Sequence, residues 1–286
     1  MESLRSCLDA LARQTMATSD FEVVVVDDGS PVATAGIQEE FASRLRLRVV
    51  RQENAGPAAA RNRGVREAAG DLVAFTDDDC LPRPGWLEHL TAAEAVNPGS
   101  LVGGSTVNGL PDDLFASTSQ LIVDLVYEHF NADPDDAFFI TSNNMLCRRD
   151  RLLDLGGFDS SYRRAGAEDR DFCDRWRTAG HKLVWRHDAV IEHRHPQSLS
   201  EFVDLHYRYG RGAHRYQRQR KARRSGTMRS DLRFHGTLPR RVWRHVGRKC
   251  APWQGLRIVS ALVVWQIANA AGFAAEAWAD RRRGAG

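Results

Sequence analysis

Residues 21–30 read FEVVVVDDGS, and residues 70–80 read GDLVAFTDDDC. Each stretch contains an almost continuous apolar run that ends in acidic residues. Such runs are typical of strands buried on both faces of a parallel sheet. Between them, the pattern predicts a helix over 33–45, a strand over 47–51 and a helix over 58–69. This alternation of strand and helix predicts an α/β fold with a doubly wound, mostly parallel sheet and flanking helices.

The pattern continues on both sides of these stretches. Upstream, leucines at helical spacing predict a helix that ends near Gln14. Downstream, the apolar periodicity is looser and predicts shorter elements. We expect helices over 86–96, 114–130, 149–155 and 168–179, and strands over 101–107, 138–147 and 182–185.

Charge is distributed unevenly along the chain. The net charge is +3, but residues 206–249 contain fifteen Lys and Arg against one Asp, a local excess of +14. An acidic body with a basic tail indicates a polyanionic partner, either anionic lipid or nucleic acid. We expect a catalytic domain over 1–199 and a basic, helical, membrane-associated extension over 200–286.

The extension has three parts. Residues 200–219 are amphipathic and basic, 226–252 are Arg-rich and predict an irregular linker, and 256–279 are the most apolar stretch of the chain. Residues 258–275 carry no charge, which is near the lower length limit for crossing a bilayer. Basic residues flank this stretch on both sides, which favours an interfacial or re-entrant helix. The alternative is a helix packed on the protein's own surface or at a dimer contact.

Three acidic clusters follow predicted strands or begin a predicted helix. Asp27–Asp28 can bind a base or ribose, or can belong to a helix cap formed with Ser30. Asp77–Asp79 repel one another unless a cation such as Mg²⁺ or Mn²⁺ neutralises them, the alternative being a solvated turn. Glu168–Asp169 can supply a general base, or can simply favour the start of a helix.

Cysteine usage and the N-terminal segment bear on the compartment. The five cysteines are an odd number and lack metal-ligand spacing, which indicates reduced thiols. The segment MESLRSCLDA lacks the apolar run of a signal peptide. We therefore expect a cytoplasmic catalytic part, peripheral or anchored at the inner face of the cell membrane.

Four stretches together carry a resemblance to a known family. They are FEVVVVDDGS, NAGPAAARNRGVREAAGDLVAFTDDDC, SNNMLCRRDRLLDLGGFD and GAEDRDFCDRWRTAGHKLVW. In this order the chain resembles the family 2 glycosyltransferases, which have the GT-A fold. The resemblance covers most of residues 1–196.

The resemblance implies roles for residues at the nucleotide-sugar site. Asp28 would hold the nucleoside, and Arg61 would lie near the base or the diphosphate. Asp77 and Asp79 occupy the outer positions of the family's Asp-x-Asp motif, with Asp78 between them at the same site. Asp77 would face the ribose, and Asp79 would hold a Mg²⁺ or Mn²⁺ ion that bridges the diphosphate.

It also implies the reacting groups. Asp169, paired with Glu168, would deprotonate the acceptor hydroxyl in a single displacement that inverts the anomeric configuration. Of the two histidines in the segment EHRHP, His193 rather than His195 would complete the metal site. The alternative for His193 is an ordinary structural or surface histidine.

Two departures from the family's pattern stand out. Family members begin with an apolar strand before the first helix, whereas this sequence starts at that helix, so we expect a missing first strand and unpaired strand edges beside its place. Polymerising members carry a Gln-x-x-Arg-Trp motif far beyond Glu-Asp, whereas Arg175–Trp176 lie too close to Asp169. A single-addition enzyme is therefore expected.

The expected function is inverting transfer from a UDP-, GDP- or dTDP-sugar to a hydroxyl of a glycan or lipid-linked acceptor. Alternatives are a catalytically weak nucleotide-sugar-binding homologue, a nucleotidyltransferase, or a nucleic-acid-binding protein. A nucleotidyltransferase needs an N-terminal glycine-rich phosphate loop, which is not seen here. Nucleic-acid binding leaves the acidic clusters unexplained, so no nucleic-acid partner is expected. The sequence does not indicate the oligomeric state.

Overall fold

The structure is a computed structural model that describes residues 1–32, 34, 36–164, 166–247 and 251–283. The chain divides into two compact units. Unit 1 comprises residues 1–107, 133–164 and 168–194, and unit 2 comprises residues 108–132, 165–167 and 195–286. Apart from Asn108, the described strand residues belong to unit 1, and the other described elements of unit 2 are helices.

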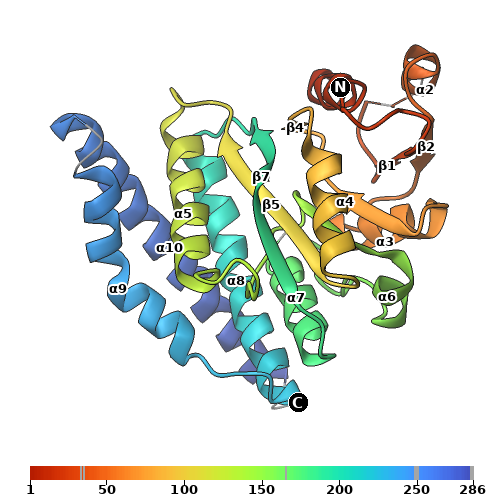
Figure 1. The fold of residues 1–286 in the computed structure, drawn as a ribbon. Coiled ribbons are helices and arrows are strands. Elements are labelled where there is room, and N and C mark those ends of the chain that lie inside the picture. Colours follow the sequence, from red (N-terminus) through yellow and green to blue (C-terminus); the bar gives the residue numbers. More distant parts are fainter. Residues whose placement is uncertain (33, 35, 165, 248–250, 284–286) are drawn as a thin grey trace. The chain divides into compact units, whose positions relative to one another are not determined.

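Unit 1 has the mixed α/β architecture expected from the sequence (Figure 1). Its helices are α1 (Glu2–Leu11), α2 (Ile37–Phe41), α3 (Pro57–Glu67), α4 (Trp86–Val96), α6 (Arg149–Asp154) and α7 (Glu168–Thr178). Its strands are β1 (Val23–Asp27), β2 (Leu47–Arg51), β3 (Leu72–Phe75), β4 (Cys80–Pro82), β5 (Leu101–Asn108), β6 (Met145–Arg148) and β7 (Leu183–His193).

The strands form two sheets. β1 and β2 pair in parallel, as the alternation of strand and helix predicts, with Val23 opposite Leu47. The second sheet has the order β3-β6-β5-β7-β4. In it, β6 pairs antiparallel with both β3 and β5, and β4 pairs antiparallel with β7. This differs from the expected mostly parallel sheet, because an apolar run reveals that a strand is buried but not in which direction it runs.

The five-stranded sheet of unit 1 has a core on each face. Successive side chains of a strand point to opposite faces. Accordingly, Leu72 and Ala74 of β3 pack in the core that contains α1, α2 and α4, whereas Val73 and Phe75 pack in the core that contains α3, α6 and α7. The sheet is thus covered by helices on both faces, which is why β3 reads as a continuous apolar run.

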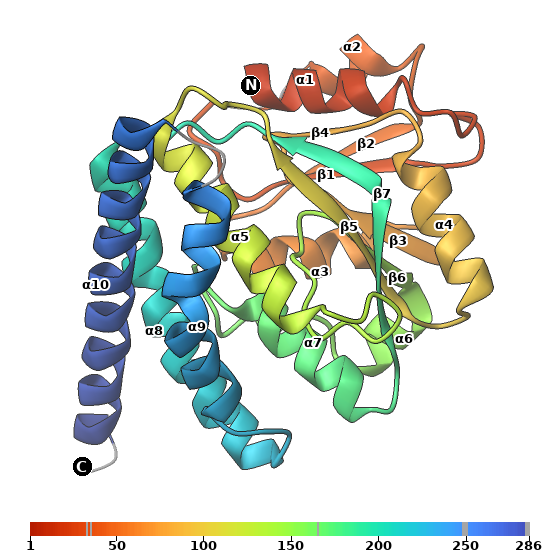
Figure 2. The same cartoon turned by 60° about the vertical axis from the view of Figure 1, so that its left-hand side comes forward.

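Unit 2 consists of α5 (Leu114–Phe130), α8 (Leu199–Arg223), α9 (Arg229–Val246) and α10 (Pro252–Arg283). Figure 2 shows α8 and α10 side by side along most of their length. Glycines permit this close approach: a Cβ on Gly210 would lie 2.0 Å from the carbonyl oxygen of Asn269, and one on Gly272 would lie 2.0 Å from that of Tyr207. The apolar core contains residues from all four helices: Ile122, Leu125, Phe202, Phe234, Leu238, Leu262 and Trp265.

One element prediction was wrong in kind. The Arg-rich segment 226–252, expected to be irregular, contains the 18-residue helix α9. Phe234 and Leu238 are buried at helical spacing, and arginine is a good helix former, so the arginines concealed an amphipathic pattern. Residues 248–250 of that segment lie outside the described residues.

Three other predicted elements differ in length. The strand expected over 138–147 is reduced to β6, because Asn144 turns the chain by donating its backbone N–H to Thr141. The strand expected over 182–185 continues to His193 through the polar residues 186–188. The helix expected over 33–45 is only the short α2, and residues 33 and 35 lie outside the described part.

By length and composition, α10 is the one helix of the described residues that could cross a membrane. One such helix is weak evidence for a membrane span. The described cysteines, Cys7, Cys80, Cys147 and Cys173, are free and buried.

Candidate active site

Strand pairing brings two candidate metal ligands together. β4 begins directly after Asp77–Asp79 and pairs with β7, with Cys80 opposite His193. The backbone N–H of Arg194 donates to the carbonyl oxygen of Asp79 at 2.8 Å. As a result, Nε2 of His193 lies 3.3 Å from Oδ2 of Asp79, although the two residues are far apart in the sequence.

These two side chains suit a divalent cation. Asp79 offers a carboxylate oxygen and His193 an imidazole nitrogen, and their side chains are 21% and 33% exposed. An ion that keeps water or phosphate oxygens as further ligands can therefore reach both atoms. His195, another residue of ligand type, follows two positions later at the boundary with unit 2. The donor set fits the Mg²⁺ or Mn²⁺ expected from the sequence.

Arg61 connects two of the acidic clusters. Its guanidinium lies 3.2 Å from Oδ1 of Asp77 and 3.0 Å from Oε1 of Glu168. The side chain is only 14% exposed, and its Cζ lies 5.7 Å from the ring centroid of Phe158. The turn after β3 and the start of α7, remote in sequence, are thus held together by one largely buried arginine.

Glu168 and Asp169 begin α7, where the helix dipole favours negative charge. Glu168 is buried against Arg61, while the Asp169 carboxylate accepts a hydrogen bond from the backbone N–H of Arg170 at 2.8 Å. Burial and the neighbouring charge of Glu168 raise the pKa of Asp169 well above its usual range. A carboxyl group with a raised pKa is a stronger base, as a proton acceptor requires.

Asp28 organises a loop. Its carboxylate accepts hydrogen bonds from the side chain of Gln52 and from the backbone N–H groups of Ala55 and Gly56, at 2.8–2.9 Å. Asp28 thereby fixes the turn between β2 and α3, immediately before the helix that carries Arg61.

In the turn after β3, Asp78 lies between Asp77 and Asp79. Desolvation and the charges of Asp79 and Asp77 raise its pKa. A cation bound beside this turn would relieve the repulsion among the three carboxylates.

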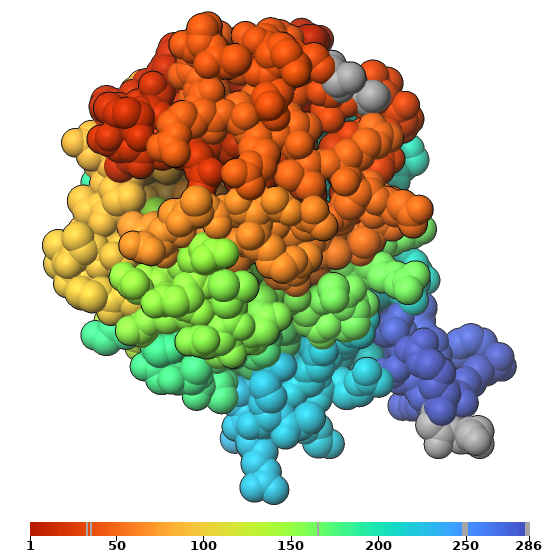
Figure 3. Space-filling model, turned by 90° about the vertical axis from the view of Figure 1, so that its right-hand side faces the viewer, coloured from red at the N-terminus to blue at the C-terminus, as the bar shows by residue number. Residues whose placement is uncertain are grey.

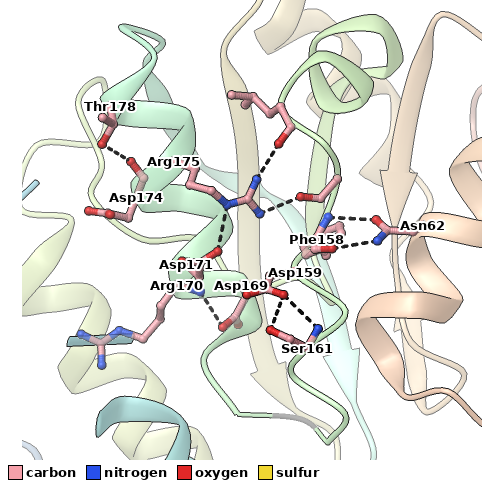
Figure 4. Close-up of polar contacts among 12 residues, drawn as sticks. Asn62, Phe158, Asp159, Ser161, Asp169, Arg170, Asp171, Asp174, Arg175 and Thr178 are labelled. Carbon is pink, nitrogen blue, oxygen red and sulfur yellow. Dashed lines mark hydrogen bonds and ion pairs between the residues drawn. The ribbon is translucent and has the colours of Figure 1, made fainter. Parts of the chain in front are cut away.

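A hydrogen-bond network of Asn62 and Arg175 with the loop over 155–158 was not expected from the sequence. In Figure 4, Asn62 of α3 exchanges two hydrogen bonds with the backbone of Phe158, each 2.8 Å long. Arg175 of α7 donates to the Asp171 carboxylate and to the carbonyl oxygens of Leu155 and Gly157. Figure 3 shows the corresponding orange and green segments in contact over the surface of unit 1.

The sequence-predicted residues thus fall into three groups. Arg61 joins Asp77 to Glu168, His193 lies beside Asp79, and Asp28 holds the loop over 52–56. The supporting residues Asn62 and Arg175 were missed. The spacing of Asp171 and Arg175, four residues apart on a helix, was the readable signal for Arg175. No local pattern distinguishes Asn62 from a surface asparagine.

Comparisons with known proteins identify the family of the chain. The sequence profile of "Glycosyl transferase family 2" matches residues 2–156. The chain is 29% identical to "Glycosyltransferase AglE" of Haloferax volcanii over 219 residues, 74% of this chain and 68% of that protein. It is 30% identical to the "Pre-mycofactocin glycosyltransferase" of Mycobacterium tuberculosis over 220 residues, 73% of this chain but only 45% of that protein.

Solved structures share the fold. The mannosyltransferase PcManGT from Pyrobaculum calidifontis, in complex with GDP-Man and Mn²⁺, matches with a TM-score of 0.69 and 20% identity, covering 97% of this chain and 84% of that one. TarS 1–349 of S. aureus, in complex with UDP-GlcNAc, matches with a TM-score of 0.54 and 19% identity, covering 93% of this chain and 77% of that one. By its sequence and its mixed α/β fold, this chain belongs to glycosyltransferase family 2 and has the GT-A fold.

Proposed function

We propose that this protein transfers one sugar at a time from a nucleoside diphosphate sugar to a hydroxyl acceptor, with inversion at the anomeric carbon and with a divalent metal ion. The observation that carries the proposal is the bridge from Arg61 to both Asp77 and Glu168. It sets the carboxylates assigned to the donor beside those assigned to the acceptor. A transfer reaction needs this proximity of the two substrates.

Asp169 is the proposed base. It takes the proton of the acceptor hydroxyl while that oxygen forms its bond to the anomeric carbon and the bond to the diphosphate oxygen breaks. The pair of electrons of the broken bond leaves with the diphosphate. Glu168, fixed by Arg61, adds negative charge that keeps Asp169 a good proton acceptor.

The other carboxylates are the proposed binding groups for the nucleoside diphosphate sugar and its metal ion. Asp28, Asp77 and Asp78 bind the nucleoside portion, Arg61 lies near the diphosphate, and Asp79 with His193 holds Mg²⁺ or Mn²⁺. When bound, the ion supplies positive charge that offsets the charge of the diphosphate.

Acceptor and location are proposed from the relatives and the extension. A Haloferax volcanii relative, 26% identical, is named "Glucosyl-dolichyl phosphate glucuronosyltransferase". Together with the basic segment 206–249, this favours a lipid-linked or cell-envelope glycan acceptor at the inner face of the membrane. We further propose that residues 1–199 form the catalytic domain and 200–286 the membrane-associated extension.

The test begins with donor binding. Thermal unfolding of the purified chain is followed against UDP, GDP and dTDP, and against their sugars, with and without Mn²⁺. We expect one nucleotide to raise the Tm only with metal, and Asp79→Ala to abolish the rise. The selected donor is then incubated with acceptors, and NMR of the product reports the anomeric configuration. A retained configuration, or turnover unaffected by EDTA, would contradict the proposal.

A further inference from the structure

The outer face of α10 is apolar and unbroken by charge. Large apolar side chains are exposed along the helix at Trp253, Leu256, Val263, Ile267 and Trp278, and Ile267 is 65% exposed. At about 100° per residue, these positions fall within an arc of roughly 120° that extends for about 38 Å. Ser260 lies in the same arc, but its hydroxyl donates to the carbonyl oxygen of Leu256, so it offers water no free donor.

The helix α9 also carries a row of exposed apolar residues. Leu232, Pro239 and Trp243 are exposed at helical spacing, and Trp243 is 72% exposed. The side chain of Gln266 in α10 lies 3.2 Å from Nδ1 of His235 in α9, a contact at the edge of both stripes. The two stripes therefore run side by side over one surface of unit 2. We call the exposed apolar residues of α9 and α10 the outer face.

Arginines border the outer face. The Arg257 guanidinium lies over the ring of Trp253, and that of Arg282 lies 3.6 Å from the ring centroid of Trp278. Arg240 and Arg244 are exposed beside Trp243. Tryptophan and arginine together are typical of the boundary between lipid headgroups and acyl chains, where an apolar ring lies beside anionic phosphate.

The contacts on the opposite side of α10 favour a helix that lies in the membrane plane over one that crosses the membrane. This side packs against α8, with a 2.6 Å ion pair between Arg211 and Glu276 and a 3.0 Å pair between Arg218 and Asp280. A spanning α10 would either lose this partner or carry the charges of α8 into hydrocarbon, which is costly. A helix lying in the plane of the membrane keeps the packing and buries only the outer face.

We propose that the outer face of α9 and α10 is a docking surface for an anionic phospholipid membrane, with both helices parallel to the membrane plane. This deepens the proposed function only in its membrane location, because donor turnover can be measured without vesicles. The basic border supplies the charge complementarity that favours anionic lipid over a second copy of the chain.

The test is co-sedimentation of the full chain with phosphatidylcholine vesicles with and without phosphatidylglycerol. We expect binding that requires phosphatidylglycerol, weakens with salt and falls at least about tenfold in Ile267→Glu. Gln254→Glu is the matched control, because it adds the same charge to the same helix away from the stripe and should bind nearly as well as wild type. Thermal unfolding of both variants checks that unit 2 is folded.

Three outcomes would overturn the proposal. They are failure of wild type to bind anionic vesicles, equal binding by Ile267→Glu, and resistance of the bound protein to a sodium carbonate wash, which indicates a span. A change of oligomeric state in Ile267→Glu without loss of vesicle binding would assign the face to a second copy. Loss of donor turnover in solution with intact vesicle binding would instead count against the proposed function alone.

Discussion

In unit 1, the first turn of α7 is held by charges, whereas in unit 2 the close approach of α8 and α10 depends on glycines as well as on ion pairs. Glu168 is fixed by the Arg61 guanidinium at 3.0 Å, and behind it Arg175 hydrogen-bonds the loop over 155–157. In unit 2, Gly210 and Gly272 leave room for the opposing backbone. Changes of charge should therefore affect the reaction in unit 1, and changes of volume should affect stability in unit 2.

The largest expected effect is on the proposed base. Asp169→Asn keeps the size of the side chain but removes its ability to accept a proton, so we expect kcat to fall by about 10²–10⁴. The Tm should change little, because the site is held by its neighbours. Steady-state kinetics and thermal unfolding of the same preparation measure both quantities. Asp188→Asn, an exposed residue of unit 1, is the control and should retain activity.

Wild-type activity should also respond to acid. Because the pKa of Asp169 is raised, kcat/KM should fall on acidification at a higher pH than an ordinary aspartate would give. A flat profile down to the normal range of aspartate would argue against Asp169 as the base.

Acid should weaken unit 2 through a buried histidine. His206 is surrounded by the rings of Phe202, Tyr209 and Trp265, and burial lowers its pKa from 6.5 to about 4. The unfolded chain therefore binds the proton first, so stability is complete above pH 6.5 and decreases as the pH falls towards 4. The loss is at most about 3 kcal/mol.

Urea unfolding of wild type and His206→Leu across this pH range measures the effect. The variant should lack this part of the pH dependence, while other groups titrate in both proteins. Parallel curves for the two proteins would show that His206 is not the group responsible.

Substitutions at two glycines test whether the close approach of α8 and α10 stabilises the protein. Gly272→Ala puts a Cβ at 2.0 Å from the carbonyl oxygen of Tyr207 and should destabilise the protein by about 1–3 kcal/mol. Gly236→Ala in α9 meets nothing within 4 Å and should stabilise it by about 0.5–1 kcal/mol. Chemical denaturation of both variants measures the difference, and equal stability would contradict packing by shape.

A substitution that keeps the positive charge tests the Arg61 bridge. Lysine cannot reach Asp77 and Glu168 at once, so Arg61→Lys should lower kcat/KM about tenfold with little change in Tm. Arg63→Lys, on the same helix and in an exposed ion pair with Glu67, is the control and should have nearly wild-type kinetics. A similar loss in both variants would mean that the bridge has no special part in the reaction.

Much of the fold could be predicted because the relevant signals are local. The run before Asp27 predicted the strand β1, although Val23–Val26 are only partly buried. The spacing of apolar residues predicted α4 and α5 closely and α1 with an end three residues too late. The prediction of an irregular segment failed at α9, because the many arginines beside its apolar residues concealed the helical pattern.

For the candidate site, the sequence determined which residues have the right chemistry: the three acidic clusters, Arg61 and His193. Only the tertiary structure decided that Arg61 joins Asp77 to Glu168 and that β4 and β7 bring Asp79 beside His193. It also decided that α10 turns Glu276 and Asp280 towards α8 and its apolar stripe outward. The physical reason is the distance along the sequence over which each kind of interaction acts. Hydrophobic periodicity and helix propensity act over a few neighbouring residues, whereas hydrogen bonds and close packing join residues that only the folded chain brings together.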